Sequence, residues 1–105
     1  MTKKLTKRDV ARYRKTIGSA WNLSDPGECI VRTFHFQRFV EAFMFVTRIG
    51  IHAEVMHQYP CIVLNANLVT LTIGDTAVTG LTPENFELAK KIDVVYALST
   101  VVTRE

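Results

Sequence analysis

The chain has 105 residues, of which 48% are hydrophobic, and a formal net charge of +3. This length argues for one domain over residues 1–105, with oligomerisation as a natural supplement to a small core. No apolar run reaches the roughly 18 residues that a membrane helix needs, and the basic N-terminus lacks the apolar segment of a signal peptide. We therefore expect a cytoplasmic protein that does not enter a membrane, with residues 1–5 flexible.

The positive charge is concentrated at the N-terminus. Residues 1–15 hold seven basic residues against Asp9 alone, a balance of +6, so the other ninety residues sum to −3. Such a segment can steer an acidic partner surface. Aromatic residues do not interleave early in it, as stacking platforms would, so we expect no nucleic-acid binding and a solvated helix face as the simplest interpretation. Its candidate partner contacts are Arg8, Arg12 and Arg14.

The next residues predict one helix and two strands. Apolar residues at helical spacing indicate a helix over residues 7–17, ended by Gly18. A short strand at 21–23 and a turn at 24–27 follow. Alternation of apolar and polar residues then predicts a strand over 29–36.

The period then changes to that of a helix. A long helix is expected over residues 37–58, with Pro60 just past its end. Gly50 inside it lowers helix stability by about 1 kcal/mol relative to alanine, which close packing would explain. The stripe predicted to form core or oligomer interface is Phe39, Phe43, Val46, Ile49, Ala53 and Met56.

Two strands and a helix complete the pattern. The strands are predicted at 61–64 and 68–74, and the helix begins at Pro83 after Thr82, a good N-cap. The order is helix, two strands, helix, two strands, helix. We therefore predict an α+β fold, a four-stranded antiparallel sheet with three helices packed on one face.

The middle and end of the chain carry a family resemblance. It rests on FHFQRFVEAFMFVTRIGIHAE (34–54), Pro60, Asn67, and GLT (80–82) with Ala89 downstream. Over roughly residues 21–93 the sequence resembles the pterin-4a-carbinolamine dehydratases, also described as dimerisation-cofactor-type proteins. The resemblance implies their fold and a homodimer.

The resemblance also points to a pterin site without its acid–base groups. The family dehydrates a 4a-hydroxy-tetrahydropterin with two histidines before the proline, a third at the end of the last strand, and an aspartate early in the last helix. Here those positions are Gln58, Tyr59, Thr76 and Asn85, and an aromatic position after the proline is Ile62. None of these side chains titrates near neutral pH. We therefore expect a degenerate site with no catalytic residue.

The other candidate ligands and acid–base groups give weaker signals. His57 lies one residue before the replaced pair, and one residue turns a helical side chain by about 100°, so it needs an irregular helix end to substitute for a lost histidine. His52 and His57 are five residues apart, which does not suit a metal site on one helix face. We expect no metal and no cofactor, and the sequence leaves pterin binding open. Cys29 and Cys61 are expected to be reduced, packed thiols.

Within this superfamily the sequence is most similar to the pterin-dehydratase-like proteins associated with α-carboxysome gene clusters. That resemblance implies a non-catalytic assembly chaperone for the large subunit of ribulose-bisphosphate carboxylase (Rubisco), located in the cytoplasm with carboxysomes. Tyr59, Gln58 and Ile62 are its candidate contacts at the pocket rim, in competition with the N-terminal arginines. Two alternatives stay open: a 4a-hydroxytetrahydrobiopterin dehydratase, which is a hydro-lyase, and a dimerisation coactivator that binds a partner helix.

Overall fold

The computed structural model describes residues 4–24, 28–74 and 80–103. Its elements are α1 (Lys7–Arg14), β1 (Asn22–Leu23), β2 (Ile30–His35), α2 (Phe39–Val55), β3 (Cys61–Asn65), β4 (Leu68–Ile73) and α3 (Pro83–Thr103). This is the predicted order. The α+β fold, with three helices and a four-stranded antiparallel sheet, is confirmed.

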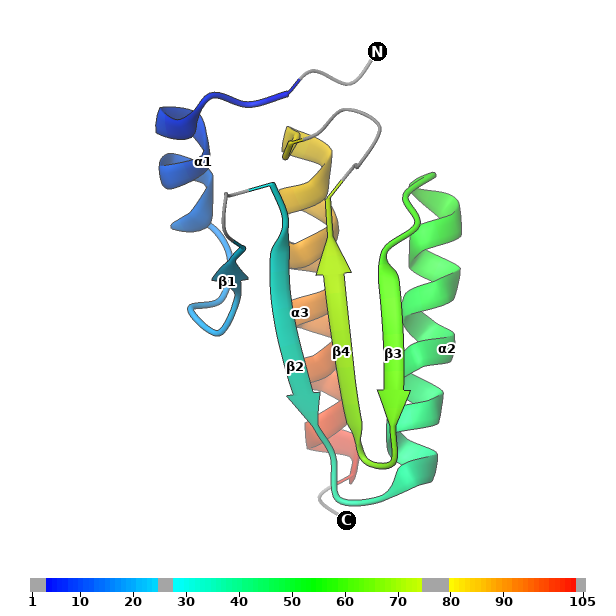
Figure 1. Cartoon of the computed structure of the whole chain (residues 1–105). Coiled ribbons are helices and arrows are strands. Elements are labelled where there is room, and N and C mark those ends of the chain that lie inside the picture. The colour runs from blue at the N-terminus through cyan, green and yellow to red at the C-terminus, as the bar shows by residue number, and fades with distance from the viewer. Residues whose placement is uncertain (1–3, 25–27, 75–79, 104–105) are drawn as a thin grey trace.

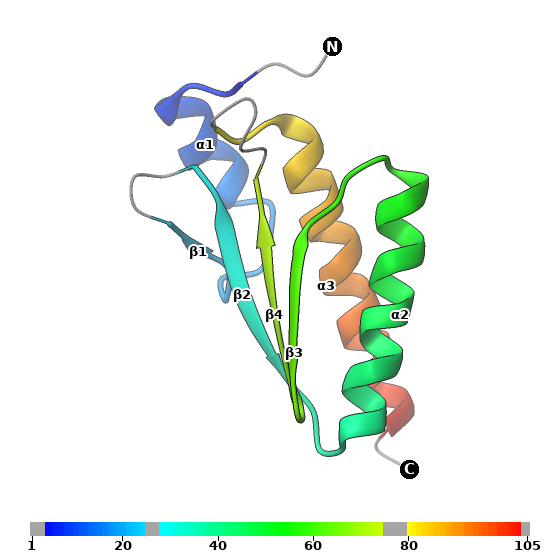
Figure 2. The same ribbon diagram turned by 45° about the vertical axis from the view of Figure 1, so that its right-hand side comes forward.

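The sheet has the strand order β1-β2-β4-β3, and all its pairs are antiparallel (Figure 1). β3 and β4 form a hairpin. α2 connects β2 to β3, and β4 then pairs with β2 in the middle of the sheet. The two long helices cover one face of the sheet (Figure 2). On the strands β2 and β4, the hydroxyls of Thr33 and Thr70 lie 3.0 Å apart and are exposed. The sheet therefore has one apolar and one more polar face.

The core lies between the sheet and the long helices. Ile30, Phe34 and Phe36 are buried, which confirms the predicted parity of β2. They pack with large side chains from the other elements, among them Trp21, Phe45, Leu71, Phe86 and Ile92. Burial of such side chains is the main favourable term in folding.

The first helix is shorter than the predicted 7–17 and ends at Arg14. The helix tightens at its end, because the N–H of Thr16 bonds to the Tyr13 carbonyl three residues back, and the Thr16 hydroxyl donates to the same carbonyl at 2.6 Å. Tyr13 also stacks on Phe86 of α3, with ring centroids 5.3 Å apart. α1 therefore packs at one end of α3.

Asp93 of α3 holds the segment that follows α1. Its carboxylate accepts hydrogen bonds from Gly18 N–H at 2.9 Å and Trp21 Nε1 at 2.8 Å. It also pairs with Arg32 of β2 at 2.8 Å. The prediction that Gly18 ends the helix is therefore wrong. Its N–H donates instead to the half-buried carboxylate of Asp93.

The interpretation of α2 needs the largest correction. The helix is Phe39–Val55, within the predicted 37–58, but Phe39 and Phe43 of the predicted stripe are more than half exposed. Gly50 is not closely packed, since an added Cβ would meet nothing within 4 Å. The helix is apolar on several sides, so the stripe could not be assigned from spacing alone. Its buried residues are Ala42, Phe45, Ile49 and Ala53.

Other predictions hold to within one residue or fall outside the described ranges. The last helix begins at Pro83, as predicted. Part of the predicted turn, residues 25–27, lies outside the described residues, as do Thr76 and residues 1–3. Leu5 is described, and its N–H donates to the Leu81 carbonyl at 2.8 Å.

Candidate functional site

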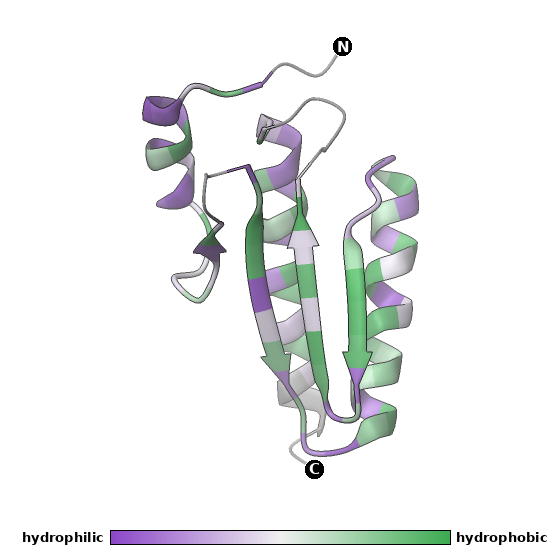
Figure 3. Ribbon diagram, viewed as in Figure 1, coloured by the Kyte–Doolittle hydropathy of each residue, from purple (hydrophilic) through white to green (hydrophobic). Residues whose placement is uncertain are grey.

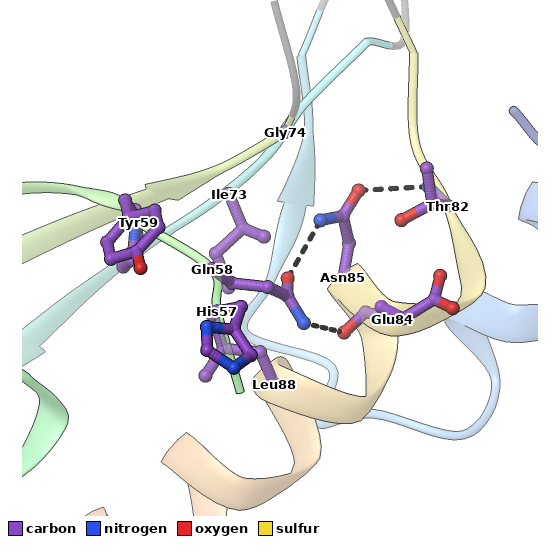
Figure 4. A pocket seen from close by; sticks show the side chains of 10 residues that line it. His57, Gln58, Tyr59, Ile73, Gly74, Thr82, Glu84, Asn85 and Leu88 are labelled. Atoms are coloured by element: carbon purple, nitrogen blue, oxygen red, sulfur yellow. Dashed lines mark hydrogen bonds between the residues drawn. The ribbon is translucent and has the colours of Figure 1, made fainter. Parts of the chain in front are cut away.

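A cavity of about 300 Å³ lies where the end of α2, the end of β4 and the start of α3 meet (Figure 4). Its wall includes three of the positions singled out in the sequence, Gln58, Tyr59 and Asn85. Gln58 and Asn85 are 27 positions apart in the chain and in direct contact here. The fold therefore brings most of the predicted degenerate site together.

An irregular helix end directs Gln58 into the cavity. His57 has φ 56°, in the left-handed region that usually takes glycine at this point. The N–H of Gln58 bonds to the Ala53 carbonyl at 3.0 Å, and that of His57 to the Glu54 carbonyl at 3.1 Å. These two bonds close the helix as a Schellman motif. The left-handed conformation costs a non-glycine residue about 1 kcal/mol or more.

The same turn brings His57 to the cavity wall. The sequence analysis required an irregular helix end for this side chain to reach the pocket, and that condition is met because the helix ends at Val55 and His57 is left-handed. His57 is exposed at the rim. It is the histidine nearest to the replaced pair along the chain.

The start of α3 positions Asn85. Thr82 precedes the helix and Pro83 begins it, where a missing N–H costs nothing. The Asn85 side chain turns back, and its Oδ1 accepts from the N–H of Thr82 at 2.9 Å. Asn85 is buried, with 7% of its surface exposed. Its amide is therefore fixed in the wall, in the way that a third helical residue commonly caps its own helix.

A chain of hydrogen bonds joins the two amides (Figure 4). Asn85 Nδ2 donates to Gln58 Oε1 at 3.0 Å. Gln58 Nε2 donates in turn to the Glu84 carbonyl at 2.7 Å. An aspartate at position 85 could accept from Thr82, but its carboxylate could not donate to Gln58. The two amides therefore match each other as donor and acceptor.

This wall can form hydrogen bonds, but its amides cannot move protons. Carboxamides stay neutral over the whole physiological range. The titratable side chains on the described wall are His57, Tyr59 and Glu84. Among the described residues, these three are the ones on the wall that could exchange a proton.

The other two predicted rim residues, Tyr59 and Ile62, differ in their position relative to the cavity. Tyr59 is 70% exposed, and Figure 4 shows it on the side of the cavity away from the amide chain. Ile62 is half-buried, packs against the core and is not part of the wall formed by the described residues. Thr76 lies outside the described residues. Of the predicted patch, Gln58 and Tyr59 therefore line the described wall of the cavity and Ile62 does not.

Gly74 forms the floor near the end of β4. A Cβ at this position would lie 2.6 Å from both the Cys29 sulfur and the Glu28 carbonyl, so only glycine allows this approach. Burial, with the nearby Glu28 charge, raises the pKa of the Cys29 thiol above its ordinary value of 9.0. Both cysteines are free, but Cys61 is exposed rather than packed as expected.

The three candidate arginines of α1 differ in their contacts. Arg12 pairs with Asp9 at 3.1 Å and lies over the Tyr13 ring. Arg8 is exposed. Arg14 donates to the Trp21 carbonyl at 3.4 Å and borders a second cavity. Arg8 and Arg12 are four residues apart and share one side of the helix, whereas Arg14 alone of the three borders the cavity.

Sequence reasoning missed the backbone groups of the site. The Glu84 carbonyl and the Thr82 N–H each bind one end of the amide chain. The signal was present in part, because an amide three residues after a helix cap commonly reaches back to it. The contact with Gln58 had no sequence signal.

The described residues offer neither a metal centre nor a helix that spans a membrane. In residues 4–24, 28–74 and 80–103, no group of three or more histidine, cysteine, aspartate or glutamate residues is placed to hold a metal ion. Within the same ranges, none of the helices has both the length and the hydropathy to cross a bilayer.

The chain is similar to known proteins over most of its length. Residues 3–95 match the family described as "Pterin 4 alpha carbinolamine dehydratase". A protein of Rhizobium johnstonii named "Putative pterin-4-alpha-carbinolamine dehydratase" is 36% identical over 79% of this chain and 82% of its own. One of the same name from Sulfurisphaera tokodaii is 37% identical over 87% and 95%.

A solved structure shows the same fold. It is titled "Crystal structure of transcriptional coactivator/pterin dehydratase from Brucella Melitensis" and superimposes with a TM-score of 0.83. Its sequence identity is 24%, and the match covers 90% of this chain and 99% of that one. By its sequence match over most of its length, the chain belongs to the pterin-4a-carbinolamine dehydratase family.

Proposed function

We propose that this chain is a non-catalytic binding protein of the family, an assembly chaperone for Rubisco large subunits in the cytoplasm of carboxysome-bearing bacteria. The observation that carries the non-catalytic part is the neutral amide chain from Thr82 through Asn85 and Gln58 to Glu84. Its groups satisfy one another where the resemblance places acid–base residues. The choice of client rests on the sequence resemblance alone.

A homodimer is part of this proposal. α2 exposes large apolar side chains to solvent in the described chain, and hydrophobic residues recur along it (Figure 3). An apolar patch of this kind favours association. A symmetric dimer presents each client contact twice, which suits a two-fold client. The exposed residues of α2 are Phe39, Val40, Phe43, Met44, Ile51 and Val55.

The dimer surface can be tested by light scattering after gel filtration. Phe43→Asp places a charge in the exposed face of α2 and should convert the dimer to a monomer. Val63→Asp is the matched control, since Val63 is 52% exposed on the edge strand β3. If only Val63→Asp dissociates the dimer, the protomers join through their sheets.

The first functional test is a dehydratase assay on purified protein, with a histidine-containing family member as positive control. We expect no rate above the uncatalysed background. Turnover close to that of the control would overturn the non-catalytic proposal. Co-expression with Rubisco large subunits should then raise the yield of assembled enzyme, and Tyr59→Ala should reduce this gain more than Tyr59→Phe, because tyrosine rings are frequent interface anchors.

A dehydratase is the second candidate function, and the position of His57 favours it. The Schellman turn places this histidine on the cavity wall, beside Gln58 (Figure 4). If the protein is active, His57→Asn should abolish turnover, since asparagine tolerates the same backbone conformation but cannot exchange protons.

A dimerisation coactivator is the third candidate, and the exposed apolar face of α2 favours it. This reading predicts binding of isolated amphipathic helices, lost in Phe43→Asp, and no effect on Rubisco yield. Binding of such helices without an effect on Rubisco would replace the chaperone proposal.

A further inference from the structure

A second cavity, of about 540 Å³, lies between α1, the segment before it, β1 and the residues that lead into α3. This size is within the range of ligand sites in proteins. The backbone bond from Leu5 to Leu81 holds the segment before α1 against the start of α3. Figure 1 shows α1 near the start of α3, on the far side of β2 from β3. We call this cavity the α1 groove.

The floor of the α1 groove is apolar. Val10 and Leu81 are buried, with 7% and 1% of their surfaces exposed. Leu5 packs against the core beside them, and Leu23 of β1 is 36% exposed at the border. The groove therefore offers apolar surface to a side chain that enters it.

The border of the groove is basic. Lys4, Lys7 and Arg14 border it, against the single carboxylate of Glu28. All three cations are exposed, and none of them takes part in an ion pair with the described residues. Arg14 is held in place by its bond to the Trp21 carbonyl. The groove therefore has positive charge that its own described residues do not neutralise.

We infer that the α1 groove binds an extended acidic segment of a partner protein, with a leucine or phenylalanine on the apolar floor and carboxylates at Lys7 and Arg14. Lys7 and Arg14 are seven residues apart, about 10.5 Å along a helix at 1.5 Å per residue. About three residues of extended chain span that distance. Charges so far apart, with Val10 and Ala11 between them, suit a peptide better than a small anion.

The partner in this inference is the client of the proposed function, so the inference rests on a binding role for the chain. It differs from the pocket-rim contact at Tyr59. β1 is an edge strand and borders the groove through Leu23, so an extended segment would lie beside an open strand edge in the described sheet. The acidic partner also matches the basic balance of residues 1–15.

The test uses a fluorescein-labelled peptide in which a leucine–phenylalanine pair lies between two glutamates, titrated with the full chain and followed by anisotropy. Lys7→Glu should weaken binding by about fivefold or more, since charge reversal removes one attraction and adds one repulsion. Arg8→Glu is the matched control. It makes the same charge change one residue away on the same helix but does not border the groove, and it should change binding by less than about twofold.

Two further peptides test the chemistry. A peptide with serines in place of leucine and phenylalanine should bind several times more weakly, and one with lysines in place of glutamates should not bind. Equal effects of Lys7→Glu and Arg8→Glu would overturn the inference. Binding of the serine peptide as tight as that of the original peptide would overturn it too, because the basic N-terminal residues would then attract any anionic peptide. Thermal unfolding followed by circular dichroism confirms that each variant is folded.

The outcome is separable from that of the proposed function. If the peptide does not bind while the chain still raises Rubisco assembly, the groove inference fails and the chaperone proposal stands. If the peptide binds as described but Rubisco assembly is unaffected, the groove stands and the client is another protein.

Discussion

The two cavities of this molecule differ in what their polar groups do. In the cavity at the end of α2, the amides of Gln58 and Asn85 bind each other and the backbone of α3. In the α1 groove, Lys4, Lys7 and Arg14 face an apolar floor with only Glu28 among them. The first cavity uses its polarity to stabilise the fold, and the second keeps it available to a partner. The two cavities are thus distinguished by how fully their polar groups already have hydrogen-bond or ion-pair partners in the described chain.

The strongest test of this contrast is Asn85→Ala. It removes two hydrogen bonds and leaves the buried Thr82 N–H without an acceptor, so the free energy of unfolding should fall by about 2–3 kcal/mol. Urea unfolding at 25 °C measures it. Glu84→Gln is the control, because only the Glu84 backbone carbonyl takes part in the amide chain, and its cost should stay near 0.5 kcal/mol. Similar losses in both variants would mean that the amide chain contributes little.

A change of opposite sign is expected at His57. His57→Gly relieves the left-handed backbone and should raise the free energy of unfolding by about 1 kcal/mol. His57→Ala removes the same ring but keeps the strained conformation, so it should leave stability nearly unchanged. If the alanine variant gained as much as the glycine variant, the imidazole itself and not the backbone would be the unfavourable element.

Substitution of a polar residue should raise stability in the α1 groove, whereas it lowers stability in the amide cavity. Lys7→Glu lowers the repulsion among the groove cations and places a negative charge in the first turn of α1, so it should stabilise the fold by about 0.5 kcal/mol while weakening peptide binding. Arg8→Glu gains the same helix-end effect without the groove term. A larger gain for Lys7→Glu, measured by thermal unfolding at low salt, would isolate the groove repulsion. A loss of stability in Lys7→Glu would contradict the contrast between the cavities.

The smallest effect is expected at Cys29, which lies at the wall between Gly74 and Glu28. Because burial raises its pKa in the folded chain above 9.0, the folded state holds the proton more tightly than the unfolded state. The free energy of unfolding should therefore fall slightly as the pH rises above about 9. Cys29→Ala should flatten this slope. Alkylation at pH 8, read by mass spectrometry, should modify the exposed Cys61 first, and faster reaction of Cys29 would contradict its burial.

Much of the fold was predictable because strand alternation and helix spacing are local signals. The buried side of β2 and the start of α3 at Pro83 followed from such patterns. The buried stripe of α2 did not, because Phe39 and Phe43 are as apolar as the residues that are buried. An apolar helix with an association surface carries no local mark of which side faces the core.

The sites were predictable only in part. Family resemblance located Gln58 and Asn85, but their direct bond depends on the Schellman turn at His57, whose left-handed φ has no sequence signal in a residue other than glycine. The α1 groove was not predicted. Lys7 and Arg14 both lie on α1, and Lys4 borders the same cavity because Leu5 bonds to Leu81, a residue far along the chain.

The matched amides also limit how this protein can evolve. Asn85→Asp alone would face the Gln58 oxygen with a carboxylate, and Gln58→His alone would disturb the bonds to both Asn85 and the Glu84 carbonyl. Each of these single changes is therefore expected to lower stability, and their effects should not be additive. A substitution at one of the two positions therefore constrains which residues the other position can accept.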